Sequence, residues 1–99
     1  MKPTIAIEGE LTVFTAHDHK ARLLGAMSPQ GELTVELADV CEFDGAGLQL
    51  LLAAHRESIR RGGSLHLAAP SFPVLAALQL TGLTDHFDVS TAETLGTAP

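Results

Sequence analysis

The strand–helix–strand unit that decides the fold spans residues 33–68 and reads LTVELADVCEFDGAGLQLLLAAHRESIRRGGSLHLA. Residues 33–37 alternate apolar and polar side chains, as a strand with one buried face does. A long helix is predicted over about 48–61, and Gly62-Gly63 end it because glycine readily takes the left-handed conformation after a helix. A second strand is predicted at 64–68. The unit is long enough for a right-handed crossover between parallel strands.

The segment before this unit predicts a hairpin followed by a helix. Residues 4–8 alternate as a half-buried strand, Gly9-Glu10 supplies a turn, and residues 11–13 predict a second short strand. Thr15 is predicted to cap the helix that follows, and this helix stops at Ser28-Pro29-Gln30-Gly31.

The segment after the unit predicts one more helix and one more strand. Ser71 is predicted to cap a third helix that ends at Gly82, and residues 87–89 predict a last short strand. The tail from about 91 to 99 is expected either to add a helical turn or to fray. Together with the hairpin, these elements predict an α/β fold. We expect one domain over residues 1–99, with a mixed four- to five-stranded sheet and flanking helices.

Composition and charge exclude several classes of protein. The 99 residues are 45% hydrophobic, and 12 acids against 6 Lys and Arg give a formal net charge of −6. A nucleic-acid binder needs a basic face to neutralise phosphates, so we expect no nucleic-acid partner. Without a secretory signal pattern or about 18 continuous apolar residues, we expect a soluble, cytoplasmic protein with no membrane insertion. The one cysteine, Cys41, excludes an internal disulfide.

The residues with catalytic potential do not form a recognisable site. No serine has the context of a nucleophile elbow, and Gly45-x-Gly47 lacks both the third glycine of a dinucleotide loop and the lysine of a P-loop. His17 and His19 lie two apart on a predicted helix, so their side chains diverge by roughly 200° and cannot chelate a metal together. We therefore expect no enzymatic activity, no catalytic residue, no metal and no cofactor.

The loop 41–47 is the predicted functional segment. In open α/β sheets, binding sites lie where strand carboxyl ends meet helix amino ends, and this loop joins the central strand to the long helix. Gly45 and Gly47 permit a tight turn and a close backbone approach. The helix start also carries a partial positive charge of about half a unit.

Three short stretches resemble the STAS family of domains (sulfate transporter and anti-sigma-factor antagonist). Residues 44–52, DGAGLQLLL, resemble the Asp-Ser-Ser/Thr-Gly-Leu motif that opens the family's second helix. Gly9-Glu10-Leu11 is similar to its early Gly-Glu-Leu turn, and 80–83 with Phe87 is similar to the segment that closes its third helix. The resemblance extends over nearly the whole chain. It implies a four- or five-stranded sheet flanked by helices and a non-catalytic, protein-docking role in signal transduction.

The resemblance also implies partners and a switch. Bacterial anti-sigma-factor antagonists of this family regulate transcription by binding a serine kinase that is also an anti-sigma factor. That kinase phosphorylates the hydroxyl residue just before the motif glycine. Here Ala46 occupies that position and Gly45 precedes it, so neither has an oxygen to phosphorylate. Relatives without this hydroxyl occur in chemotaxis-linked proteins and in lipid-transport complexes, so a chemotaxis signalling protein or a transporter ATPase is an alternative partner.

Projection of the long helix at about 100° per residue separates a core stripe from a docking face. The predicted core stripe comprises Leu48, Leu51, Leu52, His55 and Ile59. Leu50 falls nearly opposite, beside small residues. Asp44 can serve as a helix cap as well as a partner contact. An alternative for Gly45 and Gly47 is that they only form the turn and do not contact the partner. The predicted partner-binding residues are Asp44, Gly45, Ala46, Gly47, Leu48, Leu50, Ala53, Ala54 and Glu57.

Overall fold

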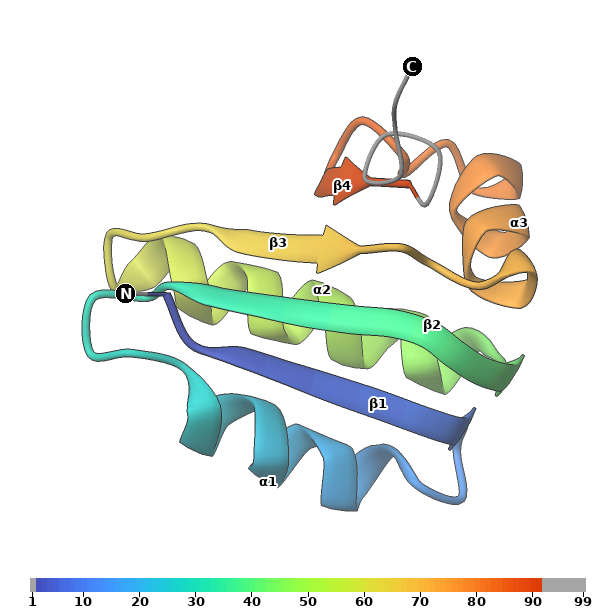
Figure 1. The fold of residues 1–99 in the computed structure, drawn as a ribbon, viewed down its shortest axis with the longest axis horizontal. Helices are drawn as coiled ribbons and strands as arrows, with labels where there is room; N and C mark the ends of the chain where they lie inside the picture. Colours follow the sequence, from blue (N-terminus) through green and yellow to red (C-terminus); the bar gives the residue numbers. More distant parts are fainter. Residues whose placement is uncertain (1, 92–99) are drawn as a thin grey trace.

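The computed structural model describes residues 2–91 as a single four-stranded sheet with helices packed on it. The strands are β1 (Thr4–Leu11), β2 (Leu33–Phe43), β3 (Leu65–Ala68) and β4 (Asp88–Ser90), in the order β1-β2-β3-β4. The helices are α1 (Ala16–Ala26), α2 (Gly45–Arg60) and α3 (Phe72–Leu80). Each helix connects two neighbouring strands, as Figure 1 shows. The predicted α/β class with a four-stranded sheet and flanking helices is confirmed.

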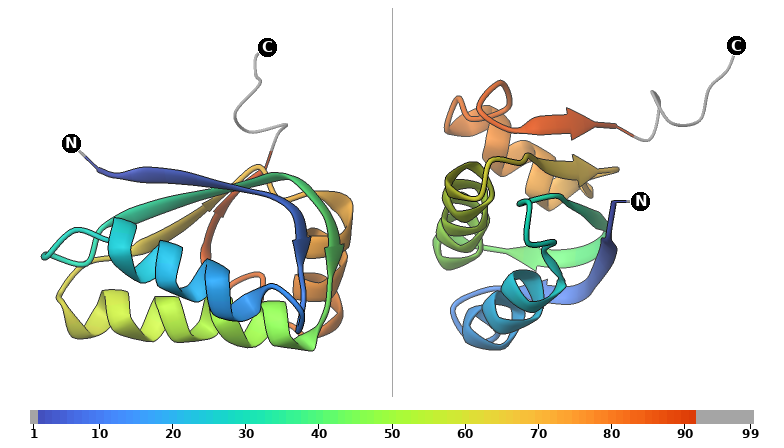
Figure 2. Two further views of the ribbon diagram at one scale, coloured as in Figure 1. Left: turned by 90° about the horizontal axis from the view of Figure 1, so that it is seen from below. Right: turned by 90° about the vertical axis from the view of Figure 1, so that its left-hand side faces the viewer.

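The core lies between the sheet and the helices. Both views in Figure 2 show α1 and α2 on the same side of the sheet. The buried strand residues that face this side include Ile7, Val35, Leu37 and Leu67, all at most 1% exposed. The residues that alternate with them are exposed or half-buried, which matches a sheet that is covered on one face.

The predicted hairpin is wrong, and so is the mixed sheet. All three strand pairings in residues 2–91 are parallel, and β1 continues through Gly9 to Leu11. Gly9 has φ 76° and lies where the register with β2 shifts, so it forms a bulge within the strand instead of a turn. Residues 12–15 then make the turn into α1, where Ala16 N–H donates to the Thr12 carbonyl at 2.8 Å.

The helix boundaries agree with the local signals in the sequence, with one shift. Helix α2 begins at Gly45, three residues earlier than predicted, because Asp44 caps it. At its other end Gly62 has φ 90°, Gly62 N–H donates to the Ile59 carbonyl, and Gly63 N–H donates to the Ser58 carbonyl. This pair of bonds is a Schellman motif, which satisfies carbonyls that the helix leaves free. Thr15 and Ser71 occupy the predicted N-cap positions, but neither side chain makes a capping bond.

The predicted core stripe of α2 is displaced around the helix. Leu51 is buried as predicted, but Ile59 is 58% exposed and His55 is only half-buried. Within residues 2–91, the buried His55 Nδ1 atom has no hydrogen-bond partner. The displacement arises because α2 packs against helix α1 as well as against the sheet at β2 and β3. Both the helix and the sheet therefore set its orientation. The residues of α2 that are buried are Gly47, Leu50, Leu51, Ala54 and Ser58.

The predicted frayed tail falls mostly on residues 92–99, which lie outside the described residues. Within residues 2–91, no helix combines the length and the apolar character that a membrane span requires. The same part of the chain brings together no group of three or more His, Cys, Asp or Glu side chains suited to hold a metal ion.

Candidate protein-docking site at the start of helix α2

Asp44 holds the loop that precedes α2 against the loop that follows β1. Its Oδ1 accepts a hydrogen bond from Gly47 N–H at 3.1 Å, as an N-cap residue does, and its Oδ2 accepts one from Val13 N–H at 3.0 Å. These bonds, that of Val13 first and that of Gly47 second, hold the pKa of the Asp44 carboxyl below its usual value of 3.8. The capping role predicted for Asp44 is confirmed.

The two motif glycines have different surroundings. Gly47 is buried, and a Cβ built on it would lie 2.2 Å from the Leu11 carbonyl oxygen and 3.0 Å from two carbons of the Phe43 ring. A Cβ built on Gly45 would have no atom within 4 Å. Gly47 therefore lets α2 start close against the end of β1, whereas Gly45 is exposed. Ala46 lies between them and is half-buried.

A groove runs between α1 and α2 from Ala46 along both helices. It consists of two adjoining hollows that share Lys20, Leu50 and Ala53. The first, of about 330 Å³, is lined by Ala16, His17, Lys20, Ala46, Gln49, Leu50, Ala53 and Arg56. The second, of about 260 Å³, is lined by Lys20, Leu23, Leu24, Leu50, Ala53, Ala54 and Glu57. The floor is apolar, and the exposed positive side chains of Lys20 and Arg56 line the same hollow as Ala46.

The structure changes the place of several predicted contact residues. Leu50 is only 5% exposed and Ala54 is buried, so the prediction that Leu50 lies on an exposed face is wrong. Leu50 lies at the bottom of the groove because α1 packs beside that face of α2. Ala53 and Leu48 are half-buried. Three of the uncharged residues predicted to contact a partner lie outside the core and near the groove. They are Gly45, Ala46 and Ala53.

Glu57 is engaged within the chain. Its carboxylate accepts hydrogen bonds from Arg60 Nη2 at 2.6 Å and from Arg61 Nε at 2.7 Å. These two guanidinium groups lower the pKa of Glu57 to about 2. Glu57 therefore lines the groove as an ion-paired group, and the positive side chains that line the groove are those of Lys20 and Arg56.

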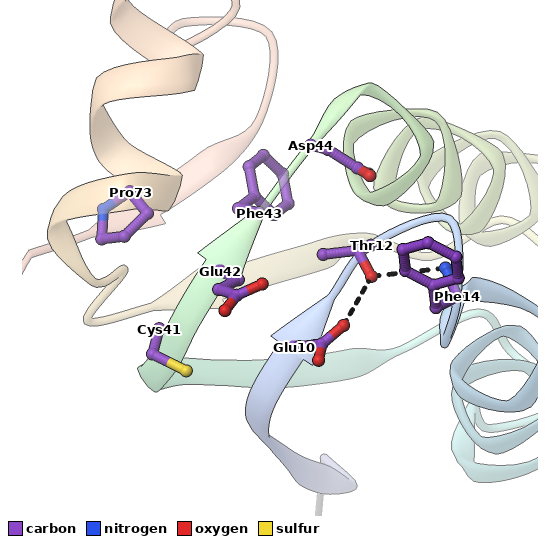
Figure 3. A pocket seen from close by; sticks show the side chains of 8 residues that line it. All are labelled: Glu10, Thr12, Phe14, Cys41, Glu42, Phe43, Asp44 and Pro73. Atoms are coloured by element: carbon purple, nitrogen blue, oxygen red, sulfur yellow. Dashed lines mark hydrogen bonds between the residues drawn. The ribbon is translucent and has the colours of Figure 1, made fainter.

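A separate hollow, which the sequence did not reveal, opens at the carboxyl ends of β1 and β2, and we call it the strand-end hollow. Figure 3 shows side chains of both strands, of the loop after β1 and of α3 around it. Its volume is about 540 Å³, and its lining comprises Glu10, Thr12, Phe14, Cys41, Glu42, Phe43, Asp44 and Pro73. Cys41 is exposed here, because Val40 takes the inward position on β2. In the sequence, Glu10 and Glu42 alternate with residues that face the core, which indicates that their own side chains point away from it. Only the parallel pairing of β1 with β2 shows that the two glutamates lie side by side.

These features define a small α/β domain with an exposed strand-to-helix junction, which is flanked by the groove between α1 and α2 and by the strand-end hollow. The family model described as "Mlab, STAS domain" matches residues 1–95, and the chain belongs to this STAS family.

Known proteins agree with this assignment. The anti-sigma-B factor antagonist of Bacillus subtilis (strain 168) is 29% identical over 86 residues, which are 87% of this chain and 79% of that protein. A candidate anti-sigma factor antagonist from Thermotoga maritima has a similar structure, with a TM-score of 0.77 and 21% identity over 90% of this chain and 80% of that one. The anti-sigma factor antagonist SpoIIAA in its unphosphorylated form gives a TM-score of 0.70 and 23% identity over 93% of this chain and 82% of that one. At these identities, the solved structures support the fold.

Proposed function

We propose that this chain is a non-catalytic regulatory module that binds a protein partner at the start of α2. The partner class that the relatives favour is an anti-sigma factor or kinase, or a signalling protein of the chemotaxis type. One observation carries the proposal: at the position of the STAS motif, the half-buried Ala46 lines an apolar groove, and the preceding Gly45 is exposed. A partner side chain can enter beside Ala46 and bury apolar surface against Leu50 and Ala53, which stabilises association by about 25 cal/mol per Å².

We further propose that this surface is permanently available for docking. Phosphorylation would add about −1.5 to −2 charges beside the start of α2 and would obstruct a partner by bulk and repulsion. Ala46 and Gly45 have no hydroxyl group, so no such change can occur at the motif position. Intact-mass analysis after incubation with ATP and the partner, if the partner is a kinase, tests this directly. The proposal fails if phosphate is found within residues 41–50.

Substitutions at the mouth of the groove test the docking site itself. Ala46→Glu places a bulky side chain in the proposed contact, and a carboxylate in the first helical turn is favourable for the helix dipole, so the fold is retained. Ala53→Arg fills the groove about two turns further along the same helix. Leu80→Glu is the matched control, because Leu80 is 88% exposed at the end of α3 and lines none of these hollows.

The measurement is copurification with the tagged chain from its own cells, followed by affinity measurement with the purified partner. We expect Ala46→Glu and Ala53→Arg to weaken binding at least tenfold, or about 1.4 kcal/mol, and Leu80→Glu to leave it unchanged. Unchanged binding by both groove variants would rule out this site.

The ATPase of a membrane lipid transporter is the second candidate partner for the same surface. The missing hydroxyl group at Ala46 favours it, because relatives without this hydroxyl occur in lipid-transport complexes. Copurification separates the two candidates. A transport subunit brings down an ATPase together with membrane proteins, whereas a regulatory module brings down a kinase, an anti-sigma factor or a chemotaxis protein.

A further inference from the structure

We propose that the strand-end hollow, lined by residues of β1, β2 and the start of α3, is a contact surface for a basic, arginine-bearing segment of the protein partner. This inference rests on the proposed function, because it assigns the chemistry of a protein that docks at the neighbouring start of α2. Asp44 links the two surfaces: it lines the hollow, and it caps the helix that bears Ala46.

An exposed aromatic side chain marks this hollow. Phe14 lines it and is 88% exposed, and the adjacent Val13 is exposed as well. On the opposite wall lies Pro73, and the residue before it, Phe72, is also largely exposed. Large apolar side chains that stand beside a hollow are typical of protein contact sites, where aromatic residues provide much of the binding energy.

The charge of the hollow selects the partner. Glu10, Glu42 and Asp44 line it, and no lysine or arginine of residues 2–91 does so. Glu42 is exposed and takes part in no ion pair or hydrogen bond of its side chain within the described chain, whereas Glu10 accepts one bond, from the Thr12 hydroxyl at 2.9 Å. The lysine and arginine side chains of residues 2–91 that form ion pairs do so elsewhere, with Glu57 and Glu32. These carboxylates repel nucleic-acid phosphates and anionic lipids, so the complementary occupant is a basic polypeptide.

Arginine matches both features of the hollow at once. Its planar guanidinium group can stack on an aromatic face and can form paired hydrogen bonds with a carboxylate, whereas the ammonium of lysine is a compact charge. Phe14 and Glu42 both line the hollow and offer these two contacts from different elements, the loop after β1 and strand β2 (Figure 3).

The two surfaces beside Asp44 carry opposite charge. The groove between α1 and α2 is lined by Lys20 and Arg56, whereas the hollow at the strand ends has Glu10 and Glu42. A partner that spans the start of α2 therefore meets positive charge on one side and negative charge on the other. This polarity fixes the orientation in which a partner with one basic and one acidic patch can dock.

Charge and aromatic variants at the hollow test the inference with the partner purified as described above. We expect Glu42→Lys and Phe14→Ser each to weaken binding about tenfold or more, and the effect of Glu42→Lys to shrink as the salt concentration rises. Asp85→Lys and Leu80→Ser are matched controls, because both residues are exposed and line none of the hollows beside α2. The controls should change the affinity by less than twofold.

A second readout does not depend on the partner. Chemical shifts of the ¹⁵N-labelled chain are recorded with a peptide of alternating arginine and leucine, and with the same peptide carrying glutamate for arginine. We expect only the arginine peptide to shift the amides of residues 10–14 and 41–44, and Glu42→Lys to remove these shifts.

The outcomes separate this inference from the proposed function. If Ala46→Glu weakens partner binding while Glu42→Lys and Phe14→Ser do not, the docking site stands and the arginine contact is overturned. Equal shifts with both peptides, or shifts spread equally over Asp85 and Asp88, also overturn it. If neither the groove variants nor the hollow variants alter binding, both proposals fail.

Discussion

Replacement of Gly47 by alanine should destabilise the fold, although alanine is the better helix former. The added Cβ would lie 2.2 Å from the Leu11 carbonyl oxygen, a backbone atom that cannot move without shifting β1 or α2. Overpacking of this kind costs about 1–3 kcal/mol and occasionally more, and a contact with backbone belongs at the upper end because the backbone must move. The gain in helix propensity, about 1 kcal/mol, offsets only part of it. We expect a net loss of about 2 kcal/mol, which lowers the melting temperature by roughly 8–16 °C in a domain of this size.

Gly45→Ala is the matched control for this prediction. Gly45 lies two residues earlier in the same motif, its φ is not in the left-handed region, and a Cβ there has no atom within 4 Å. We expect this variant to be as stable as the wild type or more stable, by up to about 1 kcal/mol. Urea unfolding followed by circular dichroism measures both. A Gly47→Ala variant as stable as the wild type, or a loss for Gly45→Ala as large as that for Gly47→Ala, would refute the assignment of Gly47 to close packing.

Three further predictions concern the fold around the site. Ser58→Ala should cost about 1–3 kcal/mol in urea unfolding, because the buried hydroxyl donates to the Gly31 carbonyl at 2.6 Å, whereas the exposed Ser64→Ala should change stability by less than about 0.5 kcal/mol. Leu50→Ala should cost about 2–5 kcal/mol, because Leu50 belongs to the core, and Leu80→Ala should cost almost nothing. Asp44 has a lowered pKa in the folded chain, so its stabilisation is complete above its unfolded value of about 3.8 and is lost as the pH falls through the folded value. The stability difference between wild type and Asp44→Asn should therefore shrink below pH 3.8, and a difference that is constant from pH 6 to pH 2.5 would contradict this.

Local signals in the sequence predicted the helices well. The glycines at 62 and 82 end α2 and α3 because their positive φ values allow the same pair of terminal hydrogen bonds in each case. Asp44 was predicted as a cap and is one. Each of these features depends on residues fewer than six positions apart, so the sequence alone contains the needed information.

Features that depend on distant neighbours were not predictable in this way. A glycine in a strand can mark a turn or a bulge, and only the pairing of β1 with β2 shows that Gly9 marks a bulge. Helical projection places Leu50 opposite the sheet-facing stripe, but α1 covers that side of α2. The hollow with Glu10, Phe14 and Glu42 exists because two parallel strands end at one edge of the sheet.

Hydrogen–deuterium exchange of the chain, free and bound to its purified partner, tests docking at the start of α2 most directly. We expect the partner to slow exchange in residues 13–20 and 44–53, on both sides of the groove and its mouth, and to leave residues 76–80 at the far end of α3 unchanged. Slower exchange confined to α3 or to the uncovered face of the sheet, with none at 44–53, would contradict this site.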